Sequence, residues 1–93
     1  MDNRKKCFLC GRNGAADPLE EHHIFNGANR NNSTKYGLTV YLCGDRCHRN
    51  GEFSAHKNIN VRRNLQRYGQ RKAMEENNWT TDDFIKIFGR NYI

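Results

Sequence analysis

The sequence predicts a small α+β domain that is stabilised by a bound metal ion. The chain has 93 residues and an apolar content of only 35%, so the core that it can bury is thin. It carries four cysteines in two closely spaced pairs, and strand-like segments in its first half precede helical patterns in its second half. A domain of this size usually needs a staple, and four cysteines can supply either two disulfides or one metal site.

The cysteine pairs have the spacing of a structural zinc site. The pairs are Cys7-x2-Cys10 and Cys43-x3-Cys47, and Gly44 in the second turn can absorb its extra residue. Zinc prefers four ligands in a tetrahedron, which two tight turns deliver with little backbone strain. The charged N-terminus has none of the apolar run of a secretory signal, and a cytoplasmic protein keeps its thiols reduced. We therefore predict one structural Zn²⁺ on these four cysteines, with buried thiols or disulfides as the alternative.

The first half of the chain shows two strand-like segments. Residues 1–6 are charged and predict a flexible basic arm. Residues 19–25 (LEEHHIF) predict a short strand, and residues 38–42 (LTVYL) are rich in β-branched and aromatic side chains and predict a second one. Between them, residues 26–37 are rich in Asn and Gly, have no periodicity and predict a surface loop. The two strands could pair as an antiparallel hairpin.

The second half of the chain predicts two helices. The first begins near Asn58 or Asn60, either of which can serve as N-cap, and stops at Asn77-Asn78. The second opens at Thr80-Thr-Asp-Asp83, a capping-box pattern, and ends at the C-cap Gly89. The apolar face of the first helix is predicted to carry Val61, Leu65, Tyr68 and Ala73.

The charge distribution favours a polyanionic partner. The net charge is +6, and residues 1–72 carry 14 Lys or Arg against 6 Asp or Glu, whereas residues 73–93 carry 2 against 4. A basic surface of this kind favours DNA or RNA, although a solvated, solubilising surface is the alternative. No segment has the length of a membrane span, so no membrane partner is expected. The candidate phosphate contacts are Arg30, Lys35, Arg46, Arg49, Lys57, Arg63, Arg67 and Arg71.

The four histidines are placed with respect to the cysteine pairs, and this pattern carries a family resemblance. The series Cys7-x2-Cys10, Leu19-x2-His22-His23-Ile24 and Leu42-Cys43-x3-Cys47-His48 resembles the zinc-stapled branch of the HNH endonucleases over residues 7–56. The resemblance implies a ββα-metal hairpin with zinc knuckles, followed by C-terminal helices. The chain would then be one domain, residues 1–93, with a core over residues 7–58 and a helical part over residues 59–93.

The resemblance also implies a metal-dependent DNA endonuclease that hydrolyses or nicks phosphodiester bonds. His23 matches the general base of the family, while His22 and His48 match ligands of a catalytic Mg²⁺, Mn²⁺ or other divalent ion. His56 could complete that set of ligands. The whole chain resembles a small phage-type HNH protein, which implies the cytoplasm of a bacterial or phage-infected cell. A homodimer would supply the two sites that cutting both strands requires.

One departure from the family pattern supports an alternative. The family has an Asn shortly before the second knuckle, whereas residues 37–41 (GLTVY) contain none, and Asn31 or Asn32 would have to substitute for it. A non-catalytic zinc-finger nucleic-acid-binding or adaptor protein is therefore the second hypothesis. On that hypothesis the histidine beside the second knuckle only hydrogen-bonds a thiolate, and the histidine pair is partly exposed without a role. A zinc-stapled protein-interaction module is a third hypothesis.

Overall fold

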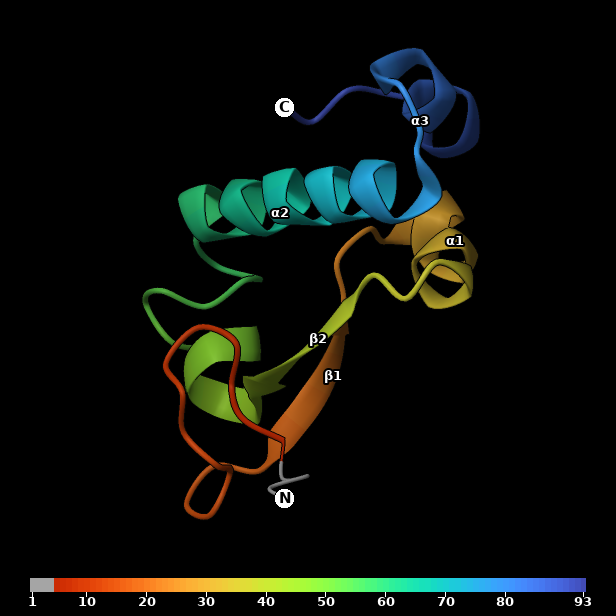
Figure 1. Ribbon diagram of the computed structural model, residues 1–93. Coiled ribbons are helices and arrows are strands. Elements are labelled where there is room, and N and C mark those ends of the chain that lie inside the picture. Colours follow the sequence, from red (N-terminus) through yellow and green to blue (C-terminus); the bar gives the residue numbers. More distant parts are fainter. Residues whose placement is uncertain (1–4) are drawn as a thin grey trace. The chain divides into compact units, whose positions relative to one another are not determined.

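The computed structural model describes residues 5–93, which form a small α+β structure (Figure 1). Its elements, in chain order, are strand β1 (Leu19–His23), the 3-10 turn η1 (Gly27–Asn29), helix α1 (Arg30–Lys35), strand β2 (Thr39–Cys43), the π-helical turn η2 (Gly44–Arg49), helix α2 (Ile59–Asn77) and helix α3 (Thr81–Phe88). None of the helices formed by residues 5–93 combines the length and apolar character that crossing a bilayer requires.

The chain divides into two compact units, each built from two segments. The first comprises Met1–His22, described from residue 5 onward, and Val40–Arg62. The second comprises His23–Thr39 and Arg63–Ile93. Of the arm predicted over residues 1–6, residues 1–4 lie outside the described part. Lys5 is held within the first unit, since its Nζ donates to the Tyr41 hydroxyl at 2.9 Å.

The two predicted strands pair in a two-stranded antiparallel sheet (Figure 1). Backbone bonds flank the pairing, because Gly44 N–H donates to the Pro18 carbonyl and Ile24 N–H donates to the Leu38 carbonyl. In β2 the alternate residues Val40 and Leu42 are buried, as expected for a strand with one face against a core. The predicted positions are confirmed to within two residues at each end.

The prediction of a surface loop over residues 26–37 is wrong for most of that range. Gly27–Lys35 forms η1 and α1, which belong to the second unit. Asn29 and Asn32 donate from their side-chain amides to carbonyl groups at the end of α3, and buried Ser33 bonds both N–H and C=O of Phe25. Asn and Ser have weak intrinsic helix propensity, so these long-range bonds, which no local pattern reveals, are what hold the short helix.

The predicted helix ends in the second half are confirmed. The Asn58 side chain accepts from the N–H groups of residues 60 and 61 and caps α2. Thr80 and Asp83 form the reciprocal capping box of α3, and Gly89 ends that helix at φ 90°, a conformation that costs glycine little. On α2, Leu65 and Ala73 are buried as predicted, whereas Tyr68 is exposed.

The second unit has an aromatic core. Phe25 lies 4.9 Å from Phe88 and 4.8 Å from Tyr92 between ring centroids, and Phe84 stacks on Phe88 at 4.4 Å. Gly69 on α2 faces this core, and a Cβ there would lie 2.8 Å from Ile24 Cγ2. The helix therefore approaches the core where it has no side chain.

Gly69→Ala is expected to destabilise the protein, although alanine favours a helix. The helix gain is about 0.5–1 kcal/mol, while forcing a methyl group into a packed core costs about 1–3 kcal/mol. We expect a net loss of about 1 kcal/mol, seen as a lower melting temperature by circular dichroism. Asn64→Ala, at an exposed position of the same helix, is the control and should be neutral or slightly stabilising. A Gly69→Ala variant that melted above wild type would contradict this packing.

Candidate metal centres

The four cysteines gather into one cluster, the cysteine tetrad. Their sulfur atoms all lie within 4.8 Å of one another, and Cys10 Sγ is 3.5 Å from Cys43 Sγ. Cys7, Cys43 and Cys47 are buried, while Cys10 is exposed. Four sulfurs at about 2.3 Å from a tetrahedral zinc lie about 3.8 Å apart, so the tetrad fits a Zn²⁺ ion with little movement.

Local hydrogen bonds shape the first knuckle. Cys7 N–H donates to the Arg12 carbonyl at 2.7 Å, and Gly11 N–H donates to the Cys7 carbonyl at 2.9 Å. Phe8 N–H donates to the Tyr41 carbonyl at 2.8 Å, which ties the knuckle to the middle of β2. The first cysteine pair is thereby held beside Cys43, which closes that strand.

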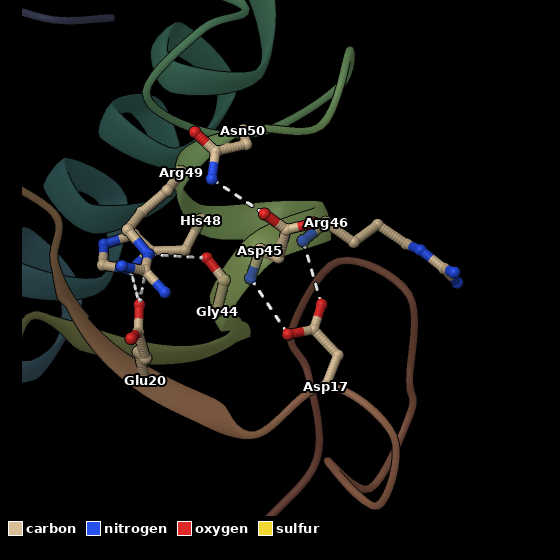
Figure 2. Close-up of polar contacts among 8 residues, drawn as sticks. All are labelled: Asp17, Glu20, Gly44, Asp45, Arg46, His48, Arg49 and Asn50. Carbon is tan, nitrogen blue, oxygen red and sulfur yellow. Dashed lines mark hydrogen bonds and ion pairs between the residues drawn. The ribbon is translucent and has the colours of Figure 1, made fainter.

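The second knuckle is the π-helical turn η2, and Asp17 caps it (Figure 2). The Asp17 carboxylate accepts from the N–H groups of Asp45 and Arg46 at 3.0 and 2.9 Å. Negative charge at this end of a helical turn satisfies donors that would otherwise lack a partner. Gly51 follows closely, and a Cβ at that position would collide with the Arg46 carbonyl oxygen.

The electrostatics of the tetrad favour a bound cation. Burial raises the pKa of the Cys7 thiol, but backbone hydrogen bonds, chiefly to Cys10 and Cys43, outweigh it and lower this pKa to about 6. Burial and the neighbouring sulfurs raise the pKa of Cys43 to about 12, and they raise that of Cys47 as well. Four thiolates therefore repel one another here, and a divalent ion that coordinates them removes that penalty.

Three of the four histidines form a second cluster in the same unit, the histidine triad of His22, His48 and His56. Their candidate ligand nitrogens all lie within 4.8 Å of one another. The ring centroids of His48 and His56 are 4.7 Å apart, and those of His22 and His48 are 5.2 Å apart. Three imidazoles at this separation could bind one divalent ion.

Each member of the triad comes from a different part of the first unit. His22 is buried on β1, His48 lies in η2, and His56 precedes α2. The last is held by the backbone, because Ala55 N–H and His56 N–H donate to the carbonyls of Cys47 and His48 at 2.8 and 3.1 Å. The tetrad and the triad therefore depend on the same turn.

Burial and the neighbouring charges favour a neutral ring at His56. Desolvation, together with His48 and Arg62, lowers the pKa of His56 below its ordinary value. A metal binds the neutral imidazole, so this shift favours the form that can act as a ligand.

Glu20 supports the triad, and the sequence analysis missed it. Its Oε1 lies 2.9 Å from His48 Nδ1 and 3.1 Å from Arg49 Nε (Figure 2). A carboxylate on Nδ1 directs Nε2 toward a metal and makes the imidazole a better ligand. The sequence does indicate this role. Glu20 lies two residues before His22, and residues i and i+2 of a strand lie on the same face.

His23 has a separate environment in the second unit. Its Nε2 lies 3.1 Å from Thr34 Oγ1, and that hydroxyl lies 3.4 Å from the Arg30 carbonyl four residues before it. The proposed substitute Asn32 is engaged elsewhere, with Asn29 and the Ile87 carbonyl. Thr34 on α1 is therefore the side chain that contacts the predicted general base.

No protein-family model, curated protein or solved structure matches the chain.

The eight basic residues predicted to contact phosphates are all exposed. In the first unit, Arg49 is engaged with Glu20 and with the Gly44 carbonyl at 3.1 Å. Arg46 and Lys57 complete that unit's set. The second unit carries Arg30, Lys35, Arg63, Arg67 and Arg71.

Glu20→Gln is expected to weaken binding of a divalent ion to the triad by about 10–100-fold, the usual effect of losing a carboxylate behind a ligating histidine. The measurement is calorimetric titration of the zinc-loaded protein with Mn²⁺ or Ni²⁺. Glu21→Gln is the matched control, because that neighbour is exposed on the opposite face of β1. Equal losses of metal affinity in both variants would mean that the overall charge, rather than the contact of Glu20 with His48, governs the affinity.

Proposed function

We propose that the protein is a metal-dependent DNA endonuclease of the HNH type. The observation that carries the proposal is the histidine triad, which lies in the same zinc-stapled unit as the tetrad and is braced by Glu20. The tetrad offers four sulfurs and so leaves zinc no open position, which suits a structural ion. The triad offers three nitrogens and would leave positions for substrate, which suits a catalytic ion.

The metal ligands in this proposal are His22, His48 and His56. A divalent ion on them would neutralise charge on the scissile phosphate and on the leaving 3′ oxygen. Mg²⁺, Mn²⁺ or another divalent ion is the candidate, and imidazole ligands favour the transition metals among these. Glu20 holds the His48 ring in the orientation that this role requires.

His23 is the proposed general base. It directly follows the ligand His22 in the chain. The imidazole accepts a proton from water as the water oxygen bonds to phosphorus, and the bond from phosphorus to the 3′ oxygen breaks. The leaving oxygen takes up a proton from solvent. A positioned general base of this kind contributes about 10²–10⁴-fold to the rate.

Thr34 is the proposed positioning residue for that base. If its hydroxyl donates to the Arg30 carbonyl, its oxygen accepts the proton on His23 Nε2. The lone pair of the ring then lies on Nδ1, which is the atom left to accept a proton from water. This contact supplies a brace in a chain that lacks the family's Asn.

Nicking of supercoiled plasmid tests the proposal. We expect conversion to the open circle with Mg²⁺, Mn²⁺ or Ni²⁺, and a large loss in His56→Ala, which removes the exposed member of the triad. If the wild-type protein cleaved no supercoiled, linear or branched DNA with any of these metals, the proposal of an endonuclease would be overturned. Retained DNA binding without nicking or a second divalent site would then favour the non-catalytic nucleic-acid-binding protein, for which the exposed basic residues also argue.

A further inference from the structure

Two surface cavities of the first unit meet at Arg46, which lines both. The smaller has a volume of about 260 Å³ and an apolar character, and its lining includes Leu9, Cys10, Cys47 and Phe53 together with one carboxylate, that of Glu52. The larger has a volume of about 490 Å³, and its lining includes Lys6, Arg12, Arg46 and Asp17. An apolar hollow therefore lies next to a basic one.

The apolar hollow is bounded by side chains that the fold leaves in water. Phe53 is 68% exposed, the largest exposed fraction among the large apolar residues of the described chain, and Leu9 is 40% exposed. Neither contributes to the core of the unit. The exposed ring of Phe53 is unfavourably hydrated and adds no stability to the core. It offers a flat apolar face to a ligand.

The basic hollow favours an anion. Lys6, Arg12 and Arg46 supply three cations, all exposed. The one carboxylate, that of Asp17, already accepts two backbone N–H groups of η2. The three cations are therefore available to bind an anionic partner.

We propose that these two cavities bind one unpaired nucleotide of a DNA strand. The base enters the apolar hollow and stacks on Phe53, while the phosphates beside it contact Arg46, Arg12 and Lys6. The small volume suits a single ring system, since pockets for drug-sized ligands span about 300–1,000 Å³. Base stacking on aromatic side chains next to a basic groove is the general means of binding single strands.

The inference adds a substrate feature to the proposed endonuclease and rests on that proposal for the identity of the polymer as DNA. A base in a regular duplex is stacked on both faces and cannot enter such a hollow without leaving its partner. DNA with a bulge, gap or branch already presents an unpaired base. The protein would therefore prefer distorted DNA to a perfect duplex.

The test compares two fluorescein-labelled duplexes that differ by one bulged 2-aminopurine. Zinc-loaded protein without any other divalent ion is titrated, and fluorescence anisotropy gives each Kd. We expect wild type to bind the bulged duplex about tenfold more tightly than the paired one, with quenching of the 2-aminopurine. Phe53→Ala should lose this preference and leave the Kd for paired DNA unchanged, while Phe53→Tyr should keep it.

Two further variants separate the base from the phosphates. Ile59→Ala removes another exposed apolar side chain of the first unit that lies outside both cavities, and it should behave as wild type. Arg12→Ala should weaken binding of both duplexes equally and reduce the salt dependence. Zinc content and circular dichroism confirm that each variant is folded.

Equal affinity of wild type for the two duplexes, or equal losses in Phe53→Ala and Ile59→Ala, would overturn the inference. Equal affinity would also leave the exposed Phe53 as a contact for a protein partner. A preference for the bulged duplex without nicking would support the unpaired-nucleotide site and overturn the proposed endonuclease activity. Nicking without such a preference would support the endonuclease activity and overturn the unpaired-nucleotide site.

Discussion

Replacement of His23 by alanine is expected to lower the nicking rate at least about a hundredfold. The reason is that the proposed general base supplies about 10²–10⁴-fold of the rate. His23 is only half-buried, so its loss should leave the fold intact. Single-turnover nicking of supercoiled plasmid, with zinc content measured on the same samples, checks this result.

Thr34 variants give the graded control for that experiment. Thr34→Val keeps the shape and loses the hydroxyl, so its nicking rate should fall by about tenfold at most, since one neutral hydrogen bond is worth roughly 0.5–1.5 kcal/mol. Thr34→Ser should recover most of the rate. Nitrogen chemical shifts of the His23 ring would report the loss of the Nε2–H tautomer in Thr34→Val, independently of activity. A His23→Ala variant that nicks like wild type would contradict its role as the base.

Removal of zinc is expected to unfold the first unit. Its described core contains three of the cysteines themselves, with Val40, Leu42 and Ala55 as the other buried apolar residues. Structural zinc contributes about 10–16 kcal/mol in small zinc-binding peptides, which exceeds the stability of most domains. A strong chelator should therefore abolish the dispersed amide signals of β2 and η2, and added Zn²⁺ should restore them.

Cys43→Ser tests the same point without a chelator. Cys43 has no exposed surface, and serine offers a poorer ligand in the same volume. We expect zinc binding to fall sharply and added zinc to give no rescue. The aromatic core of the second unit contains no zinc ligand, so the fluorescence of Trp79, which lies 4.9 Å from Tyr36, should change less. A metal-free protein with native amide signals throughout would contradict the structural role of zinc.

The parts of the structure that depend on local chemistry could be predicted from the sequence. The capping box of Thr80 and Asp83 and the C-cap at Gly89 each involve residues within one helical turn. The tetrad was predictable because tight turns fix the cysteines of each pair, and zinc chemistry then requires that the two pairs meet. The family resemblance, rather than zinc chemistry, singled out His48, which directly follows Cys47.

The parts that depend on distant contacts could not be predicted. Helix α1 is held by side-chain bonds from Asn29 and Asn32 to carbonyls more than fifty residues away, and its own composition indicates a loop. Glu20 was overlooked because a carboxylate on a strand resembles any solvated residue until its partner His48 is placed beside it. The contact of Thr34 with His23 depends on α1 and was hidden for the same reason.

The pairing of β1 with β2 limits how this chain can change in length. Backbone hydrogen bonds fix the register at both ends of the strand pair, between Gly44 and Pro18 and between Ile24 and Leu38. Neighbouring residues of a strand face opposite sides, so a slip by one position would exchange the places of His22 and His23. Insertions or deletions of one residue should therefore be eliminated within residues 18–24, which makes the spacing of this short segment as constrained as the identity of its histidines.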